Sequence, residues 1–147
     1  MGTDIHSWAI DKHGRVINSA GVWEDSKQVS PDYGIDDGEP FGQRNYSVFA
    51  FLAGVRNYSE ITPISKMRGY PSDMTVDEDD LWYRHGHSES WLSIEELNKH
   101  DYDRLIVDER YGGRTTVLRD YLGVAFFHDL VELNRIDADR VVFCFDC

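Results

Sequence analysis

The segment Arg140-Val141-Val142-Phe143-Cys144-Phe145-Asp146 is a run of β-branched and aromatic residues between two charged ends. Such a run predicts an apolar β-strand near the C-terminal end of the chain. At the other end, Thr3-Asp4-Ile5-His6-Ser7-Trp8-Ala9-Ile10 predicts a first strand, and a turn at 12–15 predicts a short return strand from Arg15. We expect the two terminal strands to be neighbours in one sheet.

The helices are predicted from apolar residues at helical spacing and from capping residues. They span residues 46–56, 75–83, 94–99 and 116–134. Asn45 is expected to cap the first, with Asn57 as its stop, and Thr75 and Ser93 open capping boxes. Residues 85–92 and 105–107 are expected to be extended. Residues 24–43 are rich in Gly, Pro and Asp and predict a long irregular loop, a feature that is often functional.

Strands at both ends, with most helices between them, indicate an α+β fold. We expect a mixed or mainly antiparallel sheet with the helices packed on one face. A length of 147 residues predicts a single globular domain, 1–147, and a 41% hydrophobic content is enough for a core.

The net charge of −12 opposes binding to a nucleic acid polymer, which needs a basic face. No stretch approaches the roughly 20 apolar residues of a membrane helix, and the N-terminus does not have the pattern of a secretory signal. We therefore expect a cytoplasmic protein without membrane contact. Of the basic residues, 11 are Arg and 4 are Lys. Arg binds phosphate and carboxylate with a planar fork, which Lys lacks.

Cys144 and Cys147 have Cys-x-x-Cys spacing, but we expect neither a redox pair nor a zinc site. Side chains three apart on a strand point to opposite faces. The sequence offers no second pair of thiol ligands, and a redox pair normally precedes a helix. Reduced thiols are the simpler interpretation.

Asp4 and His6 are two apart on a predicted strand, so they share a face that either meets solvent or lines a site. His85 and His87 are also two apart and would point the same way. Asp4, His6, His85 and His87 could thus hold a divalent metal, although no cofactor is required. Alternatively, His87 and Ser88 hydrogen-bond a turn.

Arg44-Asn45-Tyr46 stands at the start of the predicted helix 46–56, where N–H groups and positive potential favour an anion. Arg56 and Arg68 are further candidates for phosphate contacts. Ion pairs with acidic neighbours are the alternative for each Arg. Tyr46 could stack on a base or pack in the core. Phosphate-binding glycine loops and the Gly-x-Ser-x-Gly elbow are absent from the sequence.

Five segments together resemble a family of small bacteriophage and prophage proteins. They are Asp4-Ile5-His6, residues 43–57 around Arg44-Asn45-Tyr46, residues 63–73 around Arg68-Gly69-Tyr70-Pro71, His87-Ser88-Glu89-Ser90-Trp91-Leu92, and residues 140–146. The resemblance covers most of the chain, with Gln43 and Cys147 departing from the pattern. It implies a phage accessory protein, and by analogy one that acts against host nucleotide-signalling defence.

Three functions follow as hypotheses. The first is sequestration of a host immune signal, a cyclic dinucleotide or an ADP-ribose derivative, as a small anionic nucleotide-like ligand. Its expected contacts are Asp4, His6, Arg44, Asn45, Tyr46, Arg56, Arg68, His87 and Ser88. The second is hydrolysis of that signal by a phosphodiesterase, with His6 and His87 as acid and base or with the metal set. The third is an acidic inhibitor of a host defence enzyme. A homo-oligomer is compatible with all three.

Overall fold

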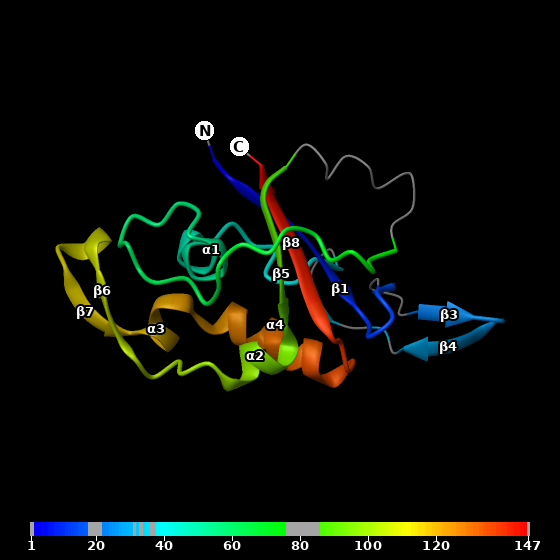
Figure 1. The fold of residues 1–147 in the computed structure, drawn as a ribbon. Helices are drawn as coiled ribbons and strands as arrows, with labels where there is room; N and C mark the ends of the chain where they lie inside the picture. The colour runs from blue at the N-terminus through cyan, green and yellow to red at the C-terminus, as the bar shows by residue number, and fades with distance from the viewer. Residues whose placement is uncertain are drawn as a thin grey trace.

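The centre of the fold is a four-stranded antiparallel sheet in the order β2-β1-β8-β5 (Figure 1). The structure is a computed structural model, and it describes residues 2–17, 22–30, 32, 34–35, 38–75 and 86–146. The strands of the sheet are β1 (Asp4–Ile10), β2 (Val16–Ile17), β5 (His87–Ser93) and β8 (Arg140–Asp146). The predicted α+β class and the pairing of the two terminal strands are therefore confirmed.

Strand β8 lies inside the sheet with both of its faces covered. Every residue from Val141 to Phe145 has no exposed surface. Phe145 packs against Phe49 of the first helix, with ring centroids 5.1 Å apart. Cys144, its neighbour, points to the opposite face because side chains alternate along a strand. Two covered faces explain why this segment is apolar throughout instead of alternating.

The α-helices of the described chain pack on one face of the sheet, as predicted (Figure 1). They are α1 (Tyr46–Ala53), α2 (Ile94–Lys99), α3 (Leu118–Leu122) and α4 (Val124–Arg135). Phe51 of α1 meets Phe126 of α4 edge to face at 5.7 Å, which places the centre of the core between these helices. Helix α1 ends at Gly54, whose φ of 69° stops it before the predicted Asn57.

The segment 66–75 covers part of the other face of the sheet (Figure 1). It begins along the edge of β5, where the Gly69 N–H donates to the Glu89 carbonyl at 3.1 Å. It ends beside the β1–β2 turn, where Thr75 N–H donates to the carbonyl of Gly14 at 2.9 Å. This cover accounts for the burial of the apolar side chains on the face away from the helices.

Two predicted elements are wrong in their boundaries. The single helix 116–134 is instead a strand, β7 (Arg114–Val117), followed by α3 and α4, which are separated at Gly123. The predicted loop 24–43 contains part of a hairpin, β3 (Val22–Glu24) with β4 (Lys27–Ser30). The predicted strand 105–107 is confirmed as β6 (Leu105–Asp108), which pairs with β7. The helix expected at 75–83 falls almost entirely on residues 76–85, outside the described residues.

Candidate ligand site at the end of the central sheet

Three strands bring predicted site residues to one end of the sheet. Asp4 of β1 pairs with Asp146 of β8, and His87 of β5 pairs with Phe145 of β8. Gly86 lies so close to β8 that a Cβ added to it would stand 2.8 Å from the sulfur of the cysteine before Phe145. The first and last strands and the start of β5 therefore meet at this end.

The Arg68-Gly69 segment reaches the same end through its neighbour Tyr70. The Tyr70 side chain hydrogen-bonds the thiol of Cys144, which is the β8 partner of His6. Burial raises the pKa of the Cys144 thiol above its ordinary value. Asp4, Arg44, Tyr70 and His87 thus lie around the same end of the sheet, although the side chains of Asp4 and His87 are on opposite faces.

Arg44 forms a two-pronged ion pair with Asp4. Its Nε donates to Asp4 Oδ1 at 2.8 Å and its Nη2 to Oδ2 at 2.9 Å, and both side chains are about half exposed. The hydrogen bonds from the guanidinium hold the pKa of Asp4 below its usual range. The ion pair was one of two interpretations of Arg44. It also holds the guanidinium in a fixed orientation at the start of α1.

Arg56 connects the N-terminal segment to the region after α1. Its Nε donates to the hydroxyl of Thr3 at 2.8 Å, and its Nη1 donates to the hydroxyl of Tyr58 at 3.0 Å. Its guanidinium lies 5.6 Å from the ring centre of Tyr46, whose hydroxyl accepts the N–H of Thr3 at 3.1 Å. Thr3 is fully buried. Arg56 and Tyr46 therefore have structural roles in tying down the chain before β1.

His6 lies between two carboxylates. Its Nε2 is 2.5 Å from Asp146 Oδ2, and its Nδ1 is 3.7 Å from Glu39 Oε1. Its side chain keeps 22% of its surface exposed, so a small molecule can reach the ring. A histidine held by a carboxylate is an arrangement that can transfer protons.

His87 lies on the other face of the sheet from His6. It pairs with Phe145, and its ring lies 6.3 Å from that of Phe145, whereas His6 pairs with Cys144. A bulge follows His87, and Ser88 adopts a φ of 53°. His87 Nδ1 and the Ser88 hydroxyl are 3.0 Å apart, which agrees with the interpretation that these residues shape a turn. The geometry does not bring His6 and His87 together as an acid–base pair.

Of the four predicted metal ligands, the structure describes Asp4, His6 and His87. Among the described residues, no group of three or more His, Cys, Asp or Glu side chains is arranged to hold a metal ion. His85 lies outside the described residues. Asp4 and His6 lie on one face of β1 with carboxylate or guanidinium partners, and His87 faces the other way.

Arg68 acts as a brace between β5 and α2. Its guanidinium forms a fork with Glu96, with Nη1 2.5 Å from Oε1 and Nη2 2.8 Å from Oε2. It stacks over the ring of Trp91 at 4.6 Å. Glu96 also accepts the backbone N–H of Ser93 at 2.7 Å in the capping box of α2. The side chain of Arg68 thus has a structural role, and it lies away from the Asp4–Arg44 pair.

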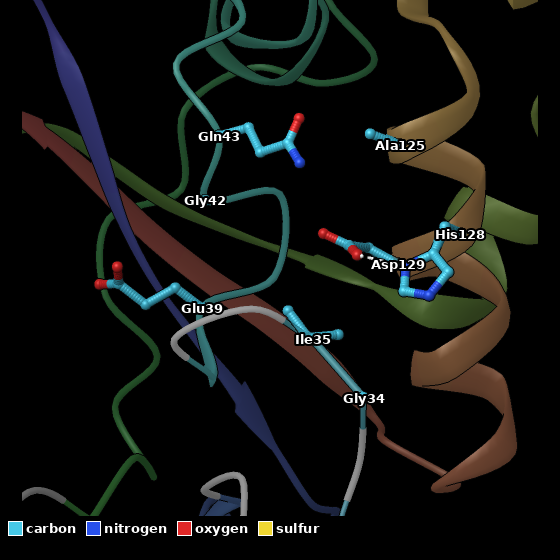
Figure 2. A pocket seen from close by; sticks show the side chains of 8 residues that line it. All are labelled: Gly34, Ile35, Glu39, Gly42, Gln43, Ala125, His128 and Asp129. Atoms are coloured by element: carbon cyan, nitrogen blue, oxygen red, sulfur yellow. Dashed lines mark hydrogen bonds and ion pairs between the residues drawn. The ribbon is translucent and has the colours of Figure 1, made fainter.

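A cavity of about 520 Å³ lies between residues 34–35 and 39–43 on one side and helix α4 on the other (Figure 2). Gln43 and Asp129 point into it, and the Glu39 carboxylate points away from it toward β1. Asp129 Oδ2 accepts the N–H of Phe41 at 2.8 Å, which fixes residues 39–43 against α4. Gln43 makes no hydrogen bond with another described residue, so its amide is available to a ligand.

Sequence reasoning missed Glu39, Gln43 and Asp129. The sequence pattern places Asp129 in a predicted helix and Glu39 in a polar loop, and neither pattern indicates a site. A signal was available in the loop itself, because long segments of this kind often carry binding residues. Nothing in the sequence shows that this loop meets α4.

No protein-family model, no curated protein and no solved structure matches the chain. The resemblance to phage proteins therefore stays a prediction. None of the described helices is long and apolar enough to span a membrane.

Proposed function

We propose that the protein binds and sequesters a small nucleotide-derived ligand in the cavity that Gln43 and Asp129 line. The observation that supports this most is a cavity of about 520 Å³ that Gln43 lines. Gln43 is the residue directly before Arg44 in the chain. Small-molecule sites have volumes of roughly 300–1,000 Å³, so the space suits a nucleoside with one or two phosphates.

Different polar side chains suit the nucleoside part and the phosphate part of such a ligand. Asp129 can only accept hydrogen bonds, which suits ribose hydroxyls and the exocyclic amine of a base. Gln43 can both donate and accept. A phosphate would be repelled by Asp129 and would instead turn outward to the guanidinium of Arg44. The resemblance to phage proteins supports a host immune signal, a cyclic dinucleotide or an ADP-ribose derivative, as the ligand.

Calorimetry with cyclic dinucleotides and ADP-ribose derivatives tests the proposal. Gln43→Ala should weaken binding roughly 2- to 12-fold, the range expected for one neutral hydrogen bond. Arg44→Gln should weaken it more, by roughly 10- to 150-fold, because a charged contact is lost. Arg119→Gln is the matched control, since that exposed Arg pairs with Asp103 away from the cavity. Wild-type protein that binds none of these ligands, or equal affinities in all variants, would refute the proposal.

Hydrolysis of the same ligand is the second candidate, and the 2.5 Å contact between His6 Nε2 and Asp146 favours it. Here water would attack the phosphorus as the P–O bond to the leaving oxygen breaks. His6 would take a proton from that water or give one to the leaving oxygen, and Asp146 would orient the ring. Incubation of protein with ligand, heat denaturation and chromatography separate the two functions. Intact ligand means sequestration. Smaller products that disappear in His6→Gln mean catalysis by this pair.

A further inference from the structure

A second polar cavity, of about 310 Å³, lies between the β6–β7 hairpin and helix α3. The hairpin pairs Asp108 with Arg114 and Ile106 with Thr116, so these four side chains share one face. Ile106 is buried, which identifies this as the face turned toward the protein. The residues that line the cavity are Asp108, Arg110, Tyr111, Arg114, Thr116, Asp120 and Tyr121.

Arg110 is held in a fixed position in this cavity. Its Nε and Nη2 each donate to the Asp108 carboxylate at 2.9 Å. Its guanidinium lies 4.8 Å from the ring centre of Tyr121 and 5.6 Å from that of Tyr111. Asp108 is itself 5% exposed and bonds the hydroxyl of Ser59 at 3.2 Å. Because the fork and the rings fix the guanidinium, a ligand would bind its Nη1 edge with little loss of side-chain entropy.

Arg114 adds a second guanidinium, which is not paired with any carboxylate of the described residues. It is exposed, and it forms neither a hydrogen bond nor an ion pair with another described residue. The charges of Arg110 and Arg114 are balanced by Asp108 and Asp120 in the lining, so attraction of a compact anion depends on direct contact with the guanidinium of Arg114 and the open Nη1 edge of Arg110. The carboxylate of Asp120, also on the cavity wall, accepts hydrogen bonds and therefore suits a hydroxyl group on the same ligand.

We propose that this cavity binds a small phosphate monoester with a hydroxylated body, such as a sugar phosphate. Arg110 and Arg114 hold the phosphate oxygens, Asp120 accepts from a hydroxyl group, and the ring of Tyr111 covers the body. Tyr111 is 71% exposed without a ligand, so contact with one would bury part of its ring. This site shares no residue with the cavity beside Gln43, so it goes beyond the proposed function and does not depend on it.

Calorimetry with ribose 5-phosphate tests the site, with inorganic phosphate and unphosphorylated ribose as comparison ligands. Ribose 5-phosphate should bind more tightly than inorganic phosphate, ribose should not bind, and added salt should weaken the interaction. Arg114→Gln should weaken binding about tenfold or more. Arg119→Gln is the matched control, because it removes the same charge from α3 at a residue that does not line the cavity.

The outcome is decisive in either direction. Absence of saturable binding, or equal affinity of wild type and Arg114→Gln, would overturn the site. So would loss of ribose 5-phosphate binding in Gln43→Ala, since the ligand would then occupy the other cavity. Because Arg114 is exposed, its substitution should leave the circular dichroism spectrum and the thermal midpoint unchanged. Nucleotide binding that survives in Arg114→Gln would leave the proposed function intact even if this site fails.

Discussion

Replacement of Asn45 by alanine should destabilise the protein by about 2 kcal/mol. The Asn45 side-chain oxygen accepts the N–H groups of Ser47 at 3.0 Å and Val48 at 3.4 Å at the start of α1. Loss of such a cap contributes about 1 kcal/mol. The Asn45 amide also donates to the Leu122 carbonyl at 3.2 Å, and the loss of this bond adds about 1 kcal/mol. Water cannot easily replace these partners, because residues 47–52 of α1 are buried.

Urea unfolding and thermal melting followed by circular dichroism measure the effect. For a chain of this size, about 2 kcal/mol corresponds to a fall of roughly 4–8 °C in the thermal midpoint. Asn45→Ser keeps an oxygen for the cap but loses the bond to Leu122, so it should show about half the effect of alanine. A change below about 0.5 kcal/mol in Asn45→Ala, or equal effects of serine and alanine, would refute this account.

The same variants test whether Asn45 contacts a ligand, as the sequence suggested. The structure uses both ends of its amide inside the protein. Once the folded fraction is taken into account, Asn45→Ser should therefore bind nucleotide as tightly as wild type. A specific loss of affinity in the folded variant would restore Asn45 to the ligand site.

Four further predictions concern the sheet end and the hairpin. Gly86→Ala should lower the free energy of unfolding by about 1–3 kcal/mol in urea titrations, because its Cβ would stand 2.8 Å from Cys144 Sγ, and Cys144→Ala should restore part of the loss. The Arg110 fork lowers the pKa of Asp108, so this pair stabilises the fold above the ordinary aspartate pKa and the contribution disappears as pH falls; Asp108→Asn should flatten the acid side of the stability profile. Burial raises the pKa of Cys144, so the unfolded thiol ionises first and stability should fall as pH rises above about 8.5. In a Cys147→Ser background, Cys144 should react with a thiol reagent far more slowly in the native protein than in urea.

The sheet was predictable because its central strand carries a strong local signal. An unbroken run of apolar β-forming residues near one end of the chain requires cover on both faces, and the alternating first strand supplies a partner. The signal for the capping box at Ser93 was equally local, because the side chains of Ser93 and Glu96 each accept a hydrogen bond from the other residue's backbone N–H. These two elements were predicted because their signals are local, whereas the equally local β3–β4 hairpin was not predicted.

The split of the predicted helix 116–134 was not predicted, because the spacing of apolar residues indicates neither a strand pairing nor a break in a helix. The β-branched residues 115–117 favour a strand, and they pair with β6. The helical spacing of the apolar residues that follow hides this preference. Gly123 has a φ of 89° and separates α3 from α4, although apolar spacing continues on both sides. Apolar spacing therefore predicts one continuous helix, because α3 and α4 both bury apolar side chains in the same core.

The sequence did not predict that His6 and His87 lie on opposite faces of the sheet. His6 and His87 are both polar residues at strand positions, and alternation alone allows them to face each other. The bulge after His87 decides against this, because two residues of β5 there oppose one of β8. A bulge depends on the register of two strands that lie far apart in the chain, so the sequence of β5 alone does not indicate it.

The arginines show why an ion pair does not by itself exclude a ligand contact. Arg44 and Arg68 both form forks with carboxylates, but their surroundings differ. Arg68 stacks on Trp91, and its partner Glu96 also caps α2, so its release would disturb a strand and a helix together. The Arg44–Asp4 pair is about half exposed on both sides, and exposed ion pairs contribute little to stability. Arg44 can therefore exchange part of its contact with Asp4 for a phosphate at small cost, whereas Arg68 cannot. Of these two, Arg44 is the one that we expect a nucleotide to recruit.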